Sequence, residues 1–346
     1  MASPRWLLPA EPPDPEDGVV TGGARVTALT TRLSVGVVGA AVAAAVLLPE
    51  QVSAWALGIL AAGVLLGLPH GAVDHLVPDW VAGRPGRMLR PGVLAGYAAT
   101  ALLALGALLV APVVSLLLLF AVSAVHFGMG EVAFEAERSG HPWRPGLRDI
   151  APVVGLGGLP VAVPLAWWPA EADRVLAALA PELPALLTPG VRQVALAVVG
   201  VTLLGSVLGA LARGRPGWAA EAGLLAALFT LAPPAAAFGV YFGGWHAVRH
   251  IGRLLVLDPR NGDDLAAGRL GAPLRRYAVA AAAPTAVALT GIVFLVLSAQ
   301  RPDWTAGALA VLLGLTVPHM AVVALLDRRA GRPAGVVQVR EPGRAG

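Results

Sequence analysis

The chain has 346 residues, of which 57% are hydrophobic and only 13% are charged. An average soluble domain has about 25% charged residues, so this composition, with its long apolar blocks, predicts an integral membrane protein. The absence of cysteine excludes disulfides, iron–sulfur clusters and thiolate metal sites. All 25 basic residues are arginine, so no lysine can form a Schiff base with retinal or pyridoxal phosphate. The net charge of +4 is what positive cytoplasmic loops require, and it gives no indication of nucleic-acid binding.

The two ends of the chain differ from the part between them. Residues 1–28 begin with an acidic, proline-rich stretch that is too polar for a signal peptide, so we predict a disordered N-terminal tail. Residues 29–327 hold the apolar blocks and form the predicted transmembrane domain, which would contain any active site. Residues 328–346 are predicted to be a disordered C-terminal tail.

Ten apolar blocks have about the 17 to 25 residues that a membrane-spanning helix needs. Pro112, Pro233 and the glycine- and proline-rich stretch 153–164 could each be a kink or a re-entrant turn, so the prediction is an all-α transmembrane bundle of eight to ten spans. The blocks cover residues 32–49, 53–70, 93–111, 112–130, 150–168, 191–211, 219–236, 237–257, 277–299 and 304–326.

Arginine is distributed unevenly between the two sides of the ten-span arrangement. Cytoplasmic loops of membrane proteins are enriched in positive charge, so the arginine-rich side and both termini are predicted to be cytoplasmic. The arginines on that side are Arg84, Arg87, Arg90, Arg138, Arg144, Arg148, Arg213, Arg215, Arg260, Arg269, Arg275, Arg276, Arg328 and Arg329.

Six of the seven histidines lie in or beside apolar blocks, in the half of each block nearer the predicted cytoplasmic side. Ionisable residues in spans are costly and mostly face the bundle interior. A single histidine at a helix end is more often an interfacial residue, but the convergence of several predicts a metal site built from histidine and carboxylate. The six are His70, His75, His126, His246, His250 and His319, whereas His141 lies in a polar loop.

His246 and His250 form the most specific local pattern. A spacing of four residues places both imidazoles on one face of a helix, with about 6 Å between their Cβ atoms, so the two can bind one metal ion. Zinc proteases share this spacing but need a glutamate directly after the first histidine, where this chain has Ala247.

His70 and His75 are five residues apart, which is about 140° around an ideal helix. They are therefore not expected to face the same ion, and one could bind the metal while the other supports it. Gly71 would let the backbone open beside His70. Asp74 either accepts a hydrogen bond from a ligand imidazole or is a carboxylate at headgroup level.

Two other spans each carry one histidine. His126 is followed by Glu131, which either supports a ligand or is solvated at a helix end. His319 follows Pro318, and it either takes part in the site or only fills the carbonyl that the proline leaves without a donor.

Arginines and aromatic residues surround the predicted site. Arg249 and Arg253 could anchor Asp74 or Glu131 or extend toward lipid phosphate, and the second reading is favoured for Arg253. Aromatic side chains beside the site could line an apolar slot for a ligand, although such residues are common at membrane interfaces. These aromatic residues are Phe127, Tyr241, Phe242 and Trp245.

Taken in order, four separated motifs resemble the Brp/Blh family: residues 69–75 (PHGAVDH), 126–128 (HFG), 241–250 (YFGGWHAVRH) and 318–320 (PHM). The resemblance covers roughly residues 53–326. It implies a multi-pass enzyme of the cell membrane that uses Fe²⁺ and O₂ to split the central 15,15′ double bond of β-carotene into two molecules of all-trans-retinal. A retinal-binding protein would be a partner downstream.

The resemblance also implies roles for single residues. The metal and catalytic residues would be His70, His126, His246 and His250. The supporting residues would be Asp74, His75, Glu131 and His319.

Other functions remain open from the sequence. The histidines could belong to a metal transporter, or to a carotenoid-binding or assembly protein without catalysis. A di-iron desaturase or hydroxylase would need more histidines, including adjacent pairs, and none occurs here. Bis-histidine haem would need ligands on facing helices, whereas the close pair shares one helix.

Overall fold

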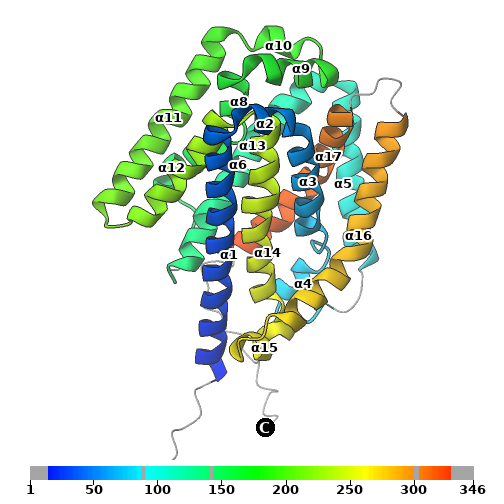
Figure 1. The fold of residues 1–346 in the computed structure, drawn as a ribbon. Helices are drawn as coiled ribbons and strands as arrows, with labels where there is room; N and C mark the ends of the chain where they lie inside the picture. The colour runs from blue at the N-terminus through cyan, green and yellow to red at the C-terminus, as the bar shows by residue number, and fades with distance from the viewer. Residues whose placement is uncertain (1–14, 87–89, 141–142, 299–303, 329–346) are drawn as a thin grey trace, which may run out of the picture.

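The computed structural model describes residues 15–86, 90–140, 143–298 and 304–328, and these residues form helices and loops without any strand. Figure 1 shows the long helices side by side in one bundle, with α9 and α10 at one end and α4 and α15 at the other. In chain order the helices are α1 (Pro15–Leu47), α2 (Pro49–Ala54), α3 (Ala56–Gly67), η2 (Leu68–Gly71), α4 (Val77–Val81), α5 (Pro91–Val110), α6 (Pro112–Arg138), η3 (Leu147–Asp149), α7 (Ile150–Gly158), α8 (Ala162–Trp167), α9 (Pro169–Leu179), α10 (Leu183–Leu186), α11 (Pro189–Ala212), α12 (Pro216–Leu231), α13 (Pro234–Gly239), the π-helical η4 (Val240–His246), α14 (Ala247–Leu257), η5 (Pro259–Asn261), α15 (Gly262–Ala266), α16 (Gly271–Ser298) and α17 (Trp304–Asp327).

The described helices include several that could cross a membrane. Six are long and apolar enough for this, and two shorter apolar helices, 56–71 and 216–231, lie among them. These helices confirm the prediction of an all-α, multi-pass membrane protein. The six described helices that are long and apolar enough to span a membrane are fewer than the eight to ten spans that we predicted.

Two predicted boundaries differ from the structure. The first helix begins at Pro15, inside the stretch that we predicted to be a tail up to residue 28, and proline is well suited to the first turn of a helix. The block predicted at 150–168 is divided into α7 and α8 by a turn at residues 159–161, where Pro160 cannot donate a helical hydrogen bond. Residues 1–14 of the predicted N-terminal tail, residues 329–346 of the predicted C-terminal tail and His141, which was predicted to lie in a loop, are outside the described residues.

Glycines bring α3 unusually close to α13 and η4. A Cβ atom added at Gly63 would lie 2.1 Å from the carbonyl oxygen of Gly239, and one added at Gly243 would lie 2.6 Å from the carbonyl oxygen of Gly63. A Cβ atom added at Gly67 would likewise lie 2.4 Å from Cδ1 of the Phe242 ring. Small residues spaced four apart on both partners allow such backbone contact between membrane helices. This crossing places His70, which follows Gly67, next to His246, which follows Gly243.

The main hydrophobic core lies where α1, α6, α12 and η4 meet. Phe229, Tyr241 and Trp245 are fully buried in it, and Phe127 packs edge-on against Tyr241 with ring centroids 5.3 Å apart. Aromatic side chains bury large areas and hold neighbouring helices at defined distances. The core therefore keeps η4, and with it His246, in a fixed position relative to α6.

Candidate metal centre

Five of the predicted histidines meet in the interior of the bundle. They come from η2, α6, the joined η4 and α14, and α17, which are far apart in the sequence. Each is buried, with 4–7% of its surface exposed: His70, His126, His246, His250 and His319. Imidazoles so thoroughly removed from water require partners or a metal ion.

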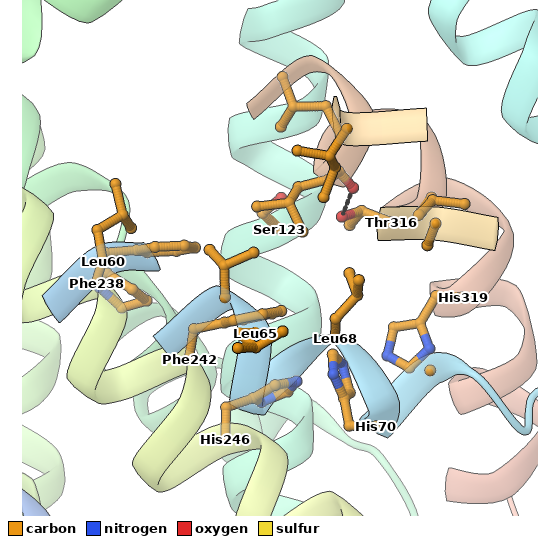
Figure 2. A pocket seen from close by; sticks show the side chains of 18 of the residues that line it. Leu60, Leu65, Leu68, His70, Ser123, Phe238, Phe242, His246, Thr316 and His319 are labelled. Carbon is orange, nitrogen blue, oxygen red and sulfur yellow. Dashed lines mark hydrogen bonds between the residues drawn. The ribbon is translucent and has the colours of Figure 1, made fainter. Parts of the chain in front are cut away.

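His70 occupies the centre of this histidine cluster. Its ring centroid lies 4.7 Å from that of His319, 5.1 Å from that of His246 and 5.5 Å from that of His250. His126 closes the cluster on another side, with ring centroids 5.2 Å from His246 and 5.1 Å from His319. Figure 2 shows His246 and His319 pointing toward His70 from opposite sides.

The His246–His250 pair lies where a π-helical turn joins an α-helix. These two rings stack almost parallel, with an interplanar angle of 8° and centroids 6.3 Å apart, as the spacing of four residues predicts. The π-helical segment η4 ends at His246, and α14 continues from the next residue as ordinary α-helix. Such π-helical insertions are rare and occur mostly at functional sites, where they redirect side chains.

Several ring nitrogens in the cluster have no hydrogen-bond partner. The Nε2 atoms of His246, His250 and His319 are buried and unpartnered among the described residues. His70 uses its Nδ1–H to donate to the carbonyl oxygen of Gly67 at 2.6 Å, which leaves its Nε2 lone pair free. Ligand atoms of His70, His246 and His319 all lie within 4.8 Å of one another. These donors fit a metal ion held by neutral imidazoles.

Asp74 supplies a carboxylate at the edge of the cluster. Its Oδ2 accepts hydrogen bonds from His319 Nδ1–H at 2.8 Å and from the Tyr97 hydroxyl at 3.1 Å, while its Oδ1 has no partner among the described residues. Asp74, His250 and His319 form a second group with ligand atoms within 4.8 Å of one another. A carboxylate on one ring nitrogen fixes the tautomer so that the other nitrogen can bind a metal.

Gly71 has a packing role that differs from the predicted opening of the backbone. A Cβ atom at this position would lie 3.2 Å from His319 Nδ1 and 3.6 Å from Asp74 Oδ2. The glycine therefore lets the His319–Asp74 pair lie directly against the turn that carries His70.

The structure places the predicted site residues unequally. His70, His246 and His250 have ligand atoms in the two convergent groups, while His126 adjoins them through its ring only. His319, which we predicted to be a supporting residue, has a ligand atom in both groups. His75 is half-buried, and among the described residues it makes no ring contact with the cluster. The sequence offered no signal for Tyr97, because it lies in a span without any motif.

Glu131 holds the helix of the histidine pair from the side away from the cluster. It accepts hydrogen bonds from Trp245 Nε1 at 2.8 Å and from Arg249 Nη1 at 2.9 Å. Arg249 also reaches Glu221 at 2.7 Å and Ser34 at 3.0 Å, and its guanidinium lies 3.6 Å from the Trp245 ring centroid. Removing one partner of a buried ion pair typically costs about 3–5 kcal/mol, so this network locks α14 against α1, α6 and α12.

Arg253 is buried and ion-paired, in contrast to the predicted extension toward lipid phosphate. Its guanidinium bonds to Glu137 of α6 at 2.8 Å and to Asp327 of α17 at 2.7 Å. Glu137 lies eleven residues after His126, and Asp327 lies eight residues after His319. Eleven residues are very nearly three helical turns, so Glu137 shares a face with His126, whereas eight residues place Asp327 about 80° around α17 from His319. Arg253 thus ties together three helices that carry the cluster.

A large apolar cavity of about 1920 Å³ adjoins the cluster. Its lining includes His70, His126, His246 and His319 together with side chains of α3, α5, α16 and α17. Of the aromatic residues predicted to line a substrate slot, Phe127 and Phe242 do so, and Figure 2 shows Phe242 between His246 and the leucines of α3. Tyr241 and Trp245, by contrast, are fully buried in the hydrophobic core and do not form part of the cavity wall.

Fold and site together define an α-helical membrane protein whose buried histidine cluster opens on an apolar cavity. The family model described as "Beta-carotene 15,15'-dioxygenase" matches residues 61–327. The chain is also 34% identical over 304 residues to the protein named "Probable beta-carotene 15,15'-dioxygenase Blh" of Halobacterium salinarum, covering 79% of this chain and 84% of that protein. The chain therefore belongs to the beta-carotene 15,15′-dioxygenase family. No solved structure matches it.

Proposed function

We propose that this protein cleaves the central 15,15′ double bond of β-carotene with O₂, using an iron ion held by the histidine cluster. The observation that carries the proposal is the set of unpartnered Nε2 atoms that converge beside an apolar cavity. Membership of the family and the name of the Halobacterium salinarum relative support the choice of reaction. The reaction balances without a reductant, since one C=C bond and one O₂ molecule yield two aldehydes.

The residues that would hold the iron are His70, His246, His250 and His319, with His126 alongside. Imidazole is a suitable ligand for iron, and bound iron supplies the means to activate dioxygen. Four neutral imidazoles leave the charge of Fe²⁺ uncompensated, and the carboxylate of Asp74 is the nearest group that offsets it. This set has His319 in the place of His126 among the four ligands that the family resemblance implied.

The apolar cavity would position the substrate. A hydrocarbon polyene has no group that binds a metal or donates a hydrogen bond, so the cavity walls alone must select the double bond that lies beside the iron. Phe127 and Phe242 stand next to His126 and His246 and would confine the chain there. The cavity is about twice the volume of the largest typical ligand pockets, which reach about 1,000 Å³, and thus suits an extended substrate.

The proposal includes the placement of the protein in its cell. We infer a cell-membrane protein of eight to ten spans with both termini in the cytoplasm, where the arginine-rich loops lie. The retinal product would pass to a retinal-binding partner.

Expression in cells that accumulate β-carotene tests the reaction directly. Chromatography of the pigments should show retinal with the unaltered chain and none with His250→Ala. The matched control is His141→Ala, at the histidine that the sequence predicts to lie in a polar loop. Apocarotenals of another length would retain the iron site but move the cleavage position. Intact β-carotene beside an iron-loaded, membrane-inserted protein would contradict the proposal and favour a binding or transport protein.

Asp74→Asn should weaken iron binding by about 10–100-fold, the usual effect of removing a partner of a ligand histidine. The amide oxygen can still accept the hydrogen bonds of His319 and Tyr97, which Oδ2 alone accepts in the unaltered chain, but the amide carries no negative charge to offset that of the ion. Iron affinity can be measured by titration with a competing chelator. Tyr97→Phe keeps the carboxylate and should have a smaller effect, and equal affinity in Asp74→Asn and the unaltered chain would refute the role of Asp74.

A further inference from the structure

Two helices that wall the cavity meet at one end only. The Tyr277 hydroxyl of α16 donates a hydrogen bond to the carbonyl oxygen of Pro69 at 2.6 Å, and η2 packs on α16 at this point. Beyond it, α3 packs on α13 and η4, whereas α16 packs on α17, and α3 and α16 are not a closely packed pair. Figure 1 shows the two helices apart along most of their length, with α17 and α5 behind the space between them.

The seam between α3 and α16 is apolar and communicates with the cavity. On α3, the side chains of Leu57, Ala61 and Leu65 follow one another at four-residue spacing, line the cavity and are exposed. On α16, Ala283 and Val287 have the same two properties. Side chains that belong to the cavity wall and to the exposed surface at once mark the border of an opening.

The opening faces the apolar part of the membrane. The stretch 271–294 of α16 is long and apolar enough to span a bilayer, and only 11% of its most apolar part is buried inside the protein. The closed end of the seam is the junction of η2 with Tyr277, and η2 carries His70. A molecule that enters at the open end therefore reaches the histidine cluster at the closed end.

We propose that the seam between α3 and α16 is a lateral portal through which a long, apolar substrate passes between the bilayer and the cavity. The identity of this substrate as a carotenoid rests on the proposed function. An elongated hydrocarbon gains nothing from crossing water, and a route from lipid to an apolar cavity avoids exposing its surface to the aqueous phase. The Tyr277–Pro69 contact closes the portal at the level of the cluster and limits how far the substrate slides.

Single cysteines test the portal cleanly because the chain has none of its own. Val287→Cys and Leu65→Cys place a thiol at the two sides of the seam. The matched controls are Val279→Cys and Leu66→Cys: Val279 is 73% exposed like Val287, and Leu66 is 67% exposed beside Leu65 at 55%, but neither control residue lines the cavity. Each variant is purified in detergent, coupled to a bulky apolar maleimide and reconstituted. Uptake of β-carotene from vesicles is then followed by absorbance without O₂.

The order of labelling distinguishes a label that blocks the portal from a label that occupies the cavity itself. Label attached before loading should slow β-carotene uptake by about tenfold or more at both seam positions, and label attached after loading should slow its release by a similar factor. A label that only filled the cavity would instead expel the bound carotenoid. Equal uptake in seam and control variants, or no uptake by the unlabelled protein, would overturn the portal. Cleavage is a separate readout, because normal uptake without retinal on adding O₂ would contradict the proposed function alone.

Discussion

His246→Ala and His250→Ala are each expected to abolish iron binding while the protein still inserts and folds. The two rings lie on one helix face with unpartnered Nε2 atoms, so each removal deletes one ligand of the proposed centre. Losing an outer partner of a ligand already costs about 10–100-fold in affinity, and losing a ligand should cost more. Elemental analysis of the purified protein measures the iron content per chain.

The control for this experiment is His141, the histidine that the sequence predicts to lie in a polar loop. His141→Ala should retain the iron content of the unaltered chain. Thermal unfolding of the iron-free proteins checks that each variant still folds, since truncating a buried ring leaves a cavity. Full iron occupancy in either His246→Ala or His250→Ala would show that the ligand assignment is wrong.

Gly63→Ala is expected to separate α3 from α13 and the following η4 and to destabilise the bundle by about 3 kcal/mol, the upper end of the usual cost of overpacking. The added Cβ atom would lie 2.1 Å from the carbonyl oxygen of Gly239, and backbone cannot move aside as a flexible side chain can. The same separation would move His70 away from His246, so iron affinity should fall with stability. The midpoint of thermal unfolding in detergent and the iron content are the two measurements.

Gly58→Ala is the matched control on the same helix. A Cβ atom there would meet only the Trp55 ring at 3.5 Å, which is ordinary van der Waals contact. This variant should unfold at the temperature of the unaltered chain or slightly above it, since alanine favours helix more than glycine does. If Gly63→Ala unfolds together with this control, the close crossing does not hold α3 in place.

Much of the helical layout was predictable because apolar block length reports directly on membrane-spanning helices. The predicted blocks 93–111 and 191–211 correspond to α5 (91–110) and α11 (189–212) within two residues. The break between α7 and α8 was left open as a kink or a re-entrant turn, because a proline signals a missing hydrogen bond without saying where the chain goes next.

The histidine cluster was partly predictable, for a similar reason. The His246–His250 pair depends only on the geometry of one helix, and the structure shows the expected parallel rings. The position of His319 depends on how α17 packs against η2, and its sequence context, a proline in a span, is equally that of a simple kink. That His319 contributes a ligand atom to both convergent groups therefore follows only from the packing of the helices.

The amino-acid sequence by itself determined the class of protein, the helix that carries the histidine pair and the family, because these depend on composition, helical periodicity and local motifs. Tertiary structure alone decided that Asp74 pairs with His319, that Arg253 joins Glu137 and Asp327, and that α3 and α16 line one apolar cavity. The physical reason is that each of these depends on how helices distant in sequence approach one another. That approach is governed by side-chain volume at the crossings, such as the glycines shared by α3 and η4, and a single sequence does not state which crossings form.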